Sequence, residues 1–532
     1  MLKHPYYIYG PNTLQVPANL NFGEFILEKL MKYGDRTAMI DCATDEHITY
    51  KEIAQQAMNF AISLTRMGVK KGETIGIMSE NRHEYIGAVI GANCTGAVLT
   101  TISTAYVKDE LLHVLKISKP KYMICSPNMY KTHEKTLKFI RFIGKIILFG
   151  EERYPRVIMF NDLTFERNKV IKNIRYEDFT SVEVRGQTDT LFIFYSSGTT
   201  GLPKGVMLTH LNIISACLLP PSHDPKVSVF TISPWYHVMG ILGTLASLFL
   251  GRTMVYIAKF DMDLYLKTIE KYKIYQLVVV PPVLVAACKY PSKYDLSSVR
   301  AIYSGAAPLP TSTIQNVKDK FPNCDAVLQG YGATELTLGV IRCSVDTENI
   351  KIGSVGTISA NTIIKVVDIE TRQPLGPNCP GEICVKGELL MKGYVGLRAD
   401  SDIDHEGFYK TGDIGYYDDE HCFFIVDRLK ELIKYKGFQV PPAELEAVLL
   451  KHPGIKDAAV IGVEDRSAGE VPRAFVVKQP DTQLSEQEVK DFIAERLSNP
   501  KRLRGGVRFL DQIPKSASGK ILRKELRKTL KA

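Results

Sequence analysis

A run of small, hydroxylated and glycine residues at positions 195–205 contains a lysine, Lys204, near its end. Glycines allow backbone N–H groups to turn towards an anion, hydroxyl groups add hydrogen-bond donors, and a lysine adds a mobile positive charge. The run therefore predicts a loop that binds phosphate. It differs from the nucleotide-triphosphatase loop, which needs glycine before the lysine and Ser or Thr after it, because Pro203 and Gly205 stand there. A flexible Ser/Gly/Thr linker is the alternative interpretation.

The segments on either side of this run indicate how it is held. The apolar residues at 191–194 predict a buried strand, and the sequence at 206–219 predicts a helix that ends before Pro220 and Pro221. Strand, loop and helix in this order is the setting that a phosphate loop requires, whereas a linker seldom joins a buried strand to a helix. We therefore expect a nucleotide site here.

A second candidate site is the segment at 329–335, which follows a strand ending at Leu328. Its glycines expose backbone, Tyr331 offers a flat face and Glu335 offers a carboxylate. Magnesium prefers one or two carboxylates together with phosphate oxygens and water. Beside a triphosphate, Glu335 is therefore a candidate metal ligand, although taken alone it would be interpreted as a surface glutamate at the start of a helix.

Two further turns have residue types that suit a nucleoside. A flat adenine could lie against the backbone of the small residues at 304–308. Asp413, at the end of the turn 409–413, could accept hydrogen bonds from both ribose hydroxyls. Each segment could equally be a plain structural turn, so these two interpretations depend on their neighbours.

These segments occur in the order and spacing of one family. The chain resembles the adenylate-forming enzymes, in particular the acyl-coenzyme A synthetases similar to 4-coumarate:CoA ligase and the insect luciferases. The resemblance covers nearly the whole chain. It rests on seven segments, namely 195–205, 234–240, 304–309, 329–335, 409–415, 426–439 and 514–522.

The resemblance implies an activity and a set of ligands. The enzyme would bind ATP, Mg²⁺ and a small carboxylic acid, aromatic or fatty, form an acyl-adenylate with loss of pyrophosphate, and transfer the acyl group to coenzyme A. The implied nucleotide contacts are Ser196, Ser197, Gly198, Thr199, Thr200, Gly201 and Lys204 for the β- and γ-phosphates, Thr334 for the α-phosphate, Glu335 for Mg²⁺, Asp413 and Arg428 for the ribose, and Ala306, Gln329, Gly330 and Tyr331 around the adenine.

The resemblance also assigns roles near the C-terminus and at the acid pocket. Lys520 matches the lysine that spans the carboxylate and the α-phosphate as charge builds, and such preorganised charge is commonly the largest catalytic contribution. Lys430 falls at the hinge of a small domain whose rotation would present Lys520 for adenylation and Lys434 for thioester formation. Without the resemblance, Lys520 would be interpreted as part of a basic C-terminal tail, and Lys434 as part of a solvated basic turn. His237, a lone histidine that would otherwise be interpreted as structural, matches the family's histidine at the acid-binding pocket. Candidate cofactor-binding residues near the hinge are Lys436, Gly437 and Gln439.

The composition is that of an ordinary globular protein, with 45% hydrophobic and 23% charged residues in a chain of 532. The net charge of +9 is concentrated near the C-terminus, where 21 basic and 14 acidic residues from Lys430 onward give +7. That charge suits a polyanionic small molecule such as a nucleotide or coenzyme A, without nucleic acid as a partner. The ten cysteines lack metal-site spacing and predict reduced, mostly buried thiols.

Targeting signals are not evident in the sequence. The first ten residues lack the apolar core of a signal peptide, no segment is long and apolar enough to span a membrane, and the last three residues differ from the Ser-Lys-Leu peroxisomal address. We therefore expect a cytoplasmic protein rather than a peroxisomal one.

The alternation of β-rich and helical segments from about residue 72 to 329 predicts an α/β fold with parallel sheets covered by helices. After residue 352, short runs with turn glycines predict a β-barrel-like portion. We expect an N-terminal AMP-binding domain of several subdomains at 1–427 and a small mobile α/β lid at 428–532.

Two other functions share part of this sequence evidence. A luciferase, an ATP- and O2-dependent monooxygenase that oxidises the luciferin it adenylates, would carry the same motifs, although beetle luciferases tend to have His-His-Gly-Phe where residues 236–239 are Tyr-His-Val-Met. A nucleic-acid-binding protein would rely on the basic C-terminal unit alone. The complete set of catalytic positions disfavours the second.

Overall fold

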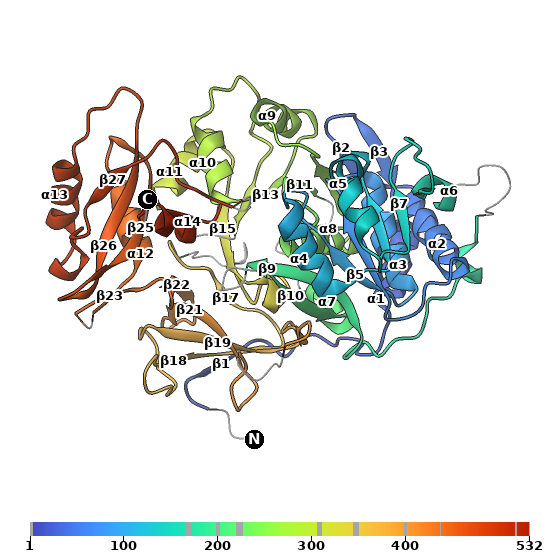
Figure 1. The fold of residues 1–532 in the computed structure, drawn as a ribbon, viewed down its shortest axis with the longest axis horizontal. Helices are drawn as coiled ribbons and strands as arrows, with labels where there is room; N and C mark the ends of the chain where they lie inside the picture. The colour runs from blue at the N-terminus through green and yellow to red at the C-terminus, as the bar shows by residue number, and fades with distance from the viewer. Residues whose placement is uncertain are drawn as a thin grey trace.

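The computed structural model describes residues 4–164, 173–197, 203–219, 227–305, 311–343, 351–397, 402–436, 438–516 and 519–530. Two large sheets and a smaller antiparallel sheet form one body, and a compact α/β unit lies beside it, at the left of Figure 1. The expected fold class, an α/β body of helix-covered parallel sheets with a small C-terminal lid, is confirmed.

The eight-stranded sheet carries the predicted phosphate loop. The strands from β9 to β8 run parallel, whereas β10 and β20 are antiparallel to their neighbours. The spatial order is β20 (Gly393–Tyr394), β10 (Pro203–Thr209), β9 (Thr190–Ser197), β5 (Val98–Thr101), β4 (Thr74–Met78), β6 (Tyr122–Cys125), β7 (Lys145–Leu148) and β8 (Ile158–Met159).

The nine-stranded sheet carries the second candidate site. Its central strands are parallel. The last two strands at one end and the last strand at the other end each pair antiparallel with the neighbouring strand. The order is β17 (Thr357–Ile358), β16 (Ile341–Arg342), β15 (Ala326–Tyr331), β14 (Ala301–Ser304), β13 (Gln276–Val279), β11 (Ser228–Thr231), β12 (Thr253–Tyr256), β2 (Thr37–Asp41) and β3 (Glu46–Thr49).

An antiparallel sheet forms the lower part of the body in Figure 1, where the sequence predicted a β-barrel-like portion. Its register places Asp413 directly opposite Arg428 on the neighbouring strand. The order is β1 (Tyr7–Tyr9), β18 (Thr362–Val367), β19 (Gly381–Gly387), β21 (Tyr409–Tyr417) and β22 (Phe423–Arg428).

The lid, which follows β22, is a five-stranded sheet with helices packed on it. Its elements are β23 (Ile433–Tyr435), β24 (Phe438–Val440), α12 (Pro442–Leu449), β25 (Ile455–Asp465), β26 (Gly469–Lys478), α13 (Glu486–Arg496), η4 (Asn499–Lys501), β27 (Val507–Phe509) and α14 (Arg523–Lys528). The helices of the body are α1 (Phe22–Tyr33), α2 (Tyr50–Arg66), α3 (His83–Cys94), α4 (Lys108–Ser118), α5 (Pro127–Phe139), α6 (Phe160–Thr164), η1 (Tyr176–Asp178), α7 (His210–Leu218), α8 (Val238–Phe249), α9 (Met262–Lys271), α10 (Pro281–Lys289), α11 (Thr311–Lys320) and η2 (Thr334–Leu336).

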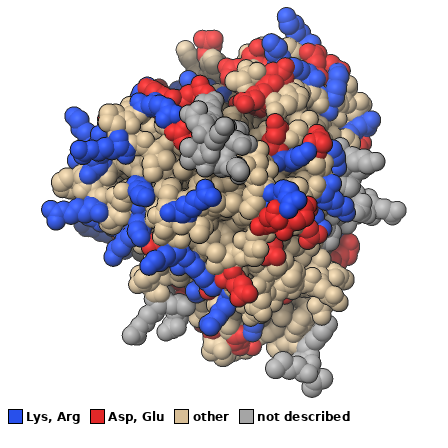
Figure 2. Space-filling view, turned by 90° about the vertical axis from the view of Figure 1, so that its right-hand side faces the viewer, with Lys and Arg blue, Asp and Glu red and all other residues tan. Residues whose placement is uncertain are grey.

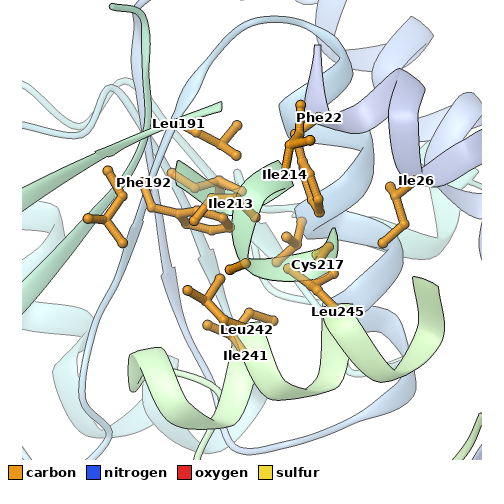
Figure 3. Packing of buried hydrophobic residues seen from close by; sticks show 14 of the residues in the cluster. Phe22, Ile26, Leu191, Phe192, Ile213, Ile214, Cys217, Ile241, Leu242 and Leu245 are labelled. Carbon is orange, nitrogen blue, oxygen red and sulfur yellow. The ribbon is translucent and has the colours of Figure 1, made fainter. Parts of the chain in front are cut away.

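The main core lies where helices of the body pack against the eight-stranded sheet. Figure 3 shows Phe22 and Ile26 of α1, Phe192 of β9, Ile213 of α7 and Leu245 of α8 converging on one cluster. Full burial of each such side chain contributes about 1.5–3 kcal/mol. This packing fixes β9, and therefore the start of the phosphate loop, to the rigid centre of the body.

The predicted helix at 206–219 is wrong in its first part. Residues 203–209 form strand β10, which pairs antiparallel with β9, so the next described element after β9 is a strand rather than a helix. Val206 and Leu208 are buried against the sheet. Thr209 then caps α7, because its Oγ1 accepts from Asn212 N at 3.3 Å and its own N–H donates to Asn212 Oδ1 at 2.7 Å.

The cysteines are free thiols, as predicted, and seven of the ten are buried. Burial raises the pKa of the Cys94 and Cys217 thiols to about 12, so both stay protonated at neutral pH. Among the helices in the described ranges, none has both the length and the apolar character to cross a bilayer.

Candidate active site

The phosphate-loop hairpin brings Lys204 close to two residues from a distant segment. Ser196 of β9 stands opposite Lys204 of β10 in the strand register. The Lys204 Nζ lies 4.6 Å from the centre of the Tyr394 ring and 3.8 Å from Asp402 Oδ2. The predicted contacts Gly198, Thr199, Thr200 and Gly201, and the side chain of Ser197, lie outside the described residues.

Glu335, the predicted metal ligand, is buried next to this hairpin, with 8% of its surface exposed. It lies in η2, whose first residue is Thr334, and η2 contacts both β9 and β10. Its Oε1 accepts a hydrogen bond from the Tyr394 hydroxyl at 2.9 Å. Tyr394 therefore links Glu335 to Lys204, and the sequence interpretation missed it because nothing in the Gly-Tyr pair of β20 indicates chemistry.

Tyr331, Asp413 and Arg428 meet in one cluster, in which Tyr331 and Asp413 are buried and Arg428 is partly exposed. The Tyr331 hydroxyl donates to Asp413 Oδ2 at 2.7 Å, and Arg428 Nε lies 3.2 Å from Asp413 Oδ1. Burial raises the pKa of Asp413, while Arg428 and Tyr331 oppose that rise. Gly332 is required beside this cluster, since a Cβ there would lie 1.8 Å from the Leu338 carbonyl oxygen.

Lys520 of the lid faces the same cluster. Burial and the nearby Arg428 lower its pKa to about 8, while Glu431 and Asp413 act in the opposite direction. A tight turn holds it, because Ser516 N donates to the Lys520 carbonyl at 2.8 Å and Gly519 has φ +78. A Cβ on Gly519 would lie 2.5 Å from Pro282 Cγ, so this turn rests directly on the start of α10.

Two hydrogen bonds stabilise the segment that joins the body to the lid. Leu429 N donates to the Gly412 carbonyl at 2.8 Å, and Ala443 N at the start of α12 donates to Asp427 Oδ2 at 2.9 Å. Burial and Arg428 lower the pKa of Lys430, the predicted hinge residue. These contacts fix the orientation of the lid in which Lys520 faces Asp413.

Lys434 and Lys436 are not brought to this cluster. Both are exposed, Lys434 in the middle of β23 and Lys436 just after it with φ +47. Their described contacts stay within the lid: Lys434 N donates to Glu470 Oε2 at 2.8 Å, and Lys436 N donates to the Ala468 carbonyl at 2.8 Å. Gly437 and the Gln439 side chain lie outside the described residues.

His237 stands at the N-terminus of α8, where burial lowers the pKa of its imidazole. Its ring centre is 4.7 Å from that of Tyr236. Met239, the second residue of α8, lies near Gly305, just after the end of β14. Trp235 points elsewhere: it is fully buried and packs edge-to-face on Tyr85.

The remaining adenine contacts are only partly described. Gln329 is buried on β15 beside Ser304 of β14, and Gly330 is exposed opposite Arg342. Ala306 lies outside the described residues. The structure thus places Gln329, Gly330 and Tyr331 on one strand end that leads into η2.

Comparisons with known proteins agree with this geometry. A model of the AMP-binding enzyme family matches residues 27–395, and a model of the AMP-binding enzyme C-terminal domain matches residues 444–520. 4-Coumarate–CoA ligase 1 of Petroselinum crispum is 38% identical over 530 residues, which are 97% of this chain and 95% of that protein. Luciferin 4-monooxygenase of Nipponoluciola cruciata is 39% identical over 519 residues, 94% of each protein.

A solved structure matches the arrangement of body and lid. MatB of Rhodopseudomonas palustris, 27% identical, matches 96% of this chain and 99% of its own, with a TM-score of 0.86 in its ATP-bound structure and 0.76 in its apo structure. The chain therefore belongs to the AMP-binding enzyme family and is an adenylate-forming enzyme of the acid:CoA ligase type.

Proposed function

We propose that this enzyme activates a carboxylic acid, aromatic or fatty, with Mg·ATP and transfers the acyl group from the adenylate to coenzyme A. The observation that carries the proposal is the electrostatic coupling of Lys520, near the end of the lid, to Asp413 of the body and to Arg428, the first residue of the lid. We place the division between body and lid at 427/428. In this arrangement a positive charge lies next to a buried carboxylate suited to ribose hydroxyls.

In the first reaction, a carboxylate oxygen of the acid attacks the α-phosphorus of ATP, an O–P bond forms, and the bond to pyrophosphate breaks. Lys520 and Thr334 would stabilise the charge that builds on the α-phosphate, and Lys204 would hold the departing pyrophosphate. Tyr331 and Gln329 would frame the adenine, and Asp413 and Arg428 the ribose. Glu335 suits Mg²⁺, because it offers a hard carboxylate oxygen that Tyr394 holds in place, and the ion would neutralise phosphate charge.

In the second reaction, the thiol of coenzyme A attacks the acyl carbonyl, a C–S bond forms, and AMP leaves. We assign this step to a rotated lid that presents Lys434 and Lys436. Two facts support the assignment: both lysines are exposed, and the match to ATP-bound MatB exceeds the match to apo MatB, as expected if the present arrangement of body and lid is the one for adenylation. His237 would line the acid pocket.

A luciferase is the second candidate function. The 39% identity to a luciferin 4-monooxygenase supports it as strongly as the ligase identities support the first. The two functions share adenylation and differ in the fate of the acyl-adenylate: a ligase transfers its acyl group to coenzyme A, whereas a luciferase oxidises it with O2.

Pyrophosphate exchange across a panel of aromatic and fatty acids tests the shared step. We expect exchange with at least one acid, followed by AMP release that accelerates when coenzyme A is added. A photon count in air is the comparison: light without coenzyme A would select the luciferase, and absence of exchange with every acid would reject adenylation.

The alkaline pH dependence of exchange should report Lys520. Since only the protonated amine stabilises phosphate charge, and its pKa in the free enzyme is about 8, kcat/KM for ATP should fall above about pH 8. The Lys520→Arg variant, whose guanidinium stays protonated, should lack this fall. A profile that is the same in both proteins would show that another group titrates.

A further inference from the structure

One edge of the eight-stranded sheet carries positive charge that the proposed reaction does not use. The crossovers β5–α4–β6 and β6–α5–β7 advance in the same direction, so α4 and α5 cover the same face of the sheet and pack against each other. Both helices end at the edge where β6 and β7 begin. We call this surface the basic edge; its exposed members are Lys116, Lys119, Lys135, Phe139, Arg141 and Lys145.

The charges of the basic edge are not neutralised within the protein. Neighbouring lysines are paired: Lys121 Nζ lies 2.7 Å from Glu73 Oε1, and Lys138 Nζ lies 2.6 Å from Glu134 Oε1. The five basic members have no such partner among the described residues. Figure 2 views the molecule from the right-hand side of Figure 1 and shows Lys and Arg side chains gathered over the left half of that face.

Phe139 adds an apolar component. It is the last residue of α5 and 84% of its surface is exposed, although Leu137 and Ile140 on either side are buried in the core beneath. Lysines near a helix C-terminus can be explained by the helix dipole. That explanation covers neither an exposed phenylalanine nor Arg141 and Lys145, which lie beyond the helix.

We propose that the basic edge docks the enzyme on an anionic lipid bilayer, with Phe139 entering the headgroup region. Binding to a membrane surface strengthens with the apolar area that is buried and with the attraction of basic side chains to anionic lipids, and both contributions occur here on one surface. The phosphate loop follows the carboxyl end of β9, which runs parallel to β5. The active site therefore opens at the opposite edge of the sheet and stays accessible while the enzyme is docked.

A bilayer fits this surface better than a nucleic acid does. Proteins that hold single strands combine a basic groove with several aromatic rings on which bases stack. The basic edge has a single aromatic member, which projects at the end of a helix. A single ring that projects among basic side chains is suited to insertion between the headgroups of an anionic bilayer.

Flotation with vesicles of phosphatidylcholine alone or with 30% phosphatidylserine tests the proposal on the full chain. We expect binding only with phosphatidylserine, and loss of binding at high salt. The variant Lys135→Ala/Arg141→Ala should bind roughly 25-fold more weakly, since each charge contributes about fivefold. Phe139→Ser should weaken binding severalfold. The matched control Lys267→Ala/Lys293→Ala removes two exposed charges from another surface and should bind as the parent does.

Several outcomes would overturn the proposal. These are equal binding to both vesicle types, no binding, an equal loss in the control pair, or full binding by Phe139→Ser. Salt-sensitive binding to a 30-nucleotide single strand but not to vesicles would assign the surface to nucleic acid instead. Pyrophosphate exchange without vesicles should be unchanged in all variants, which separates docking from the proposed catalytic function.

Discussion

Replacing Lys520 by alanine should lower the rate of pyrophosphate exchange by about 10²–10³-fold, the usual effect of removing one preorganised group that stabilises transition-state charge. Lys520 is held for this purpose by a turn that rests on Pro282 and by the neighbouring charges of Arg428 and Asp413. Transfer from a preformed acyl-adenylate to coenzyme A should continue at nearly the parent rate. Stopped-flow measurement of each half-reaction separates the two effects.

Lys434→Ala is the matched control, since it removes a lysine from the lid at a position away from the Asp413 cluster. It should retain exchange and slow the transfer to coenzyme A. Equal loss of both half-reactions in Lys520→Ala would contradict the assignment of separate faces of the lid to separate steps. Unchanged exchange would remove Lys520 from the proposed adenylation site altogether.

Local sequence signals predicted most of the fold but misplaced the start of α7. The run at 206–209 has apolar residues that fit either a helix or a strand, and pairing with β9 decides for the strand. The decisive partner is the preceding strand β9, so periodicity within the run could not reveal it. The capping pair Thr209 and Asn212 was the available signal for the helix start.

Candidate site residues that lie in sequence motifs could be predicted. Those that reach the site only through the fold were missed. Tyr331 and Asp413 lie 82 positions apart, yet both were predicted because each follows glycine in a recognisable motif. The predicted turn at 409–413 is wrong, since these residues begin strand β21, and Tyr331 ends strand β15. Tyr394 and Asp402 contact Lys204 from segments with no such signal. Their contribution depends on β20 pairing with β10, a long-range contact that one sequence does not encode locally.

Arg523→Met should destabilise the lid by about 3–5 kcal/mol, the cost of removing one partner from a buried ion pair. Arg523 Nη2 lies 2.7 Å from Glu446 Oε1 and its Nη1 lies 2.9 Å from Glu431 Oε2, and its residue is 9% exposed. Burial already raises the pKa of Glu446 to about 7 against the pull of Arg523. Without the guanidinium, the pKa of Glu446 should rise further and Glu446 must bind a proton to stay buried, so the loss of stability should be larger at pH 8 than at pH 5, with the increase above about pH 7.

Hydrogen exchange of lid amides, with thermal unfolding at both pH values, measures this effect. Lys524→Met is the control, because Lys524 is exposed on the same helix and should change stability little. Adding Glu446→Leu to Arg523→Met should recover much of the loss, since an apolar pair avoids the stranded charge. A pH-independent deficit that the second substitution does not reduce would mean that Arg523 acts through packing of its aliphatic stem rather than through its charge.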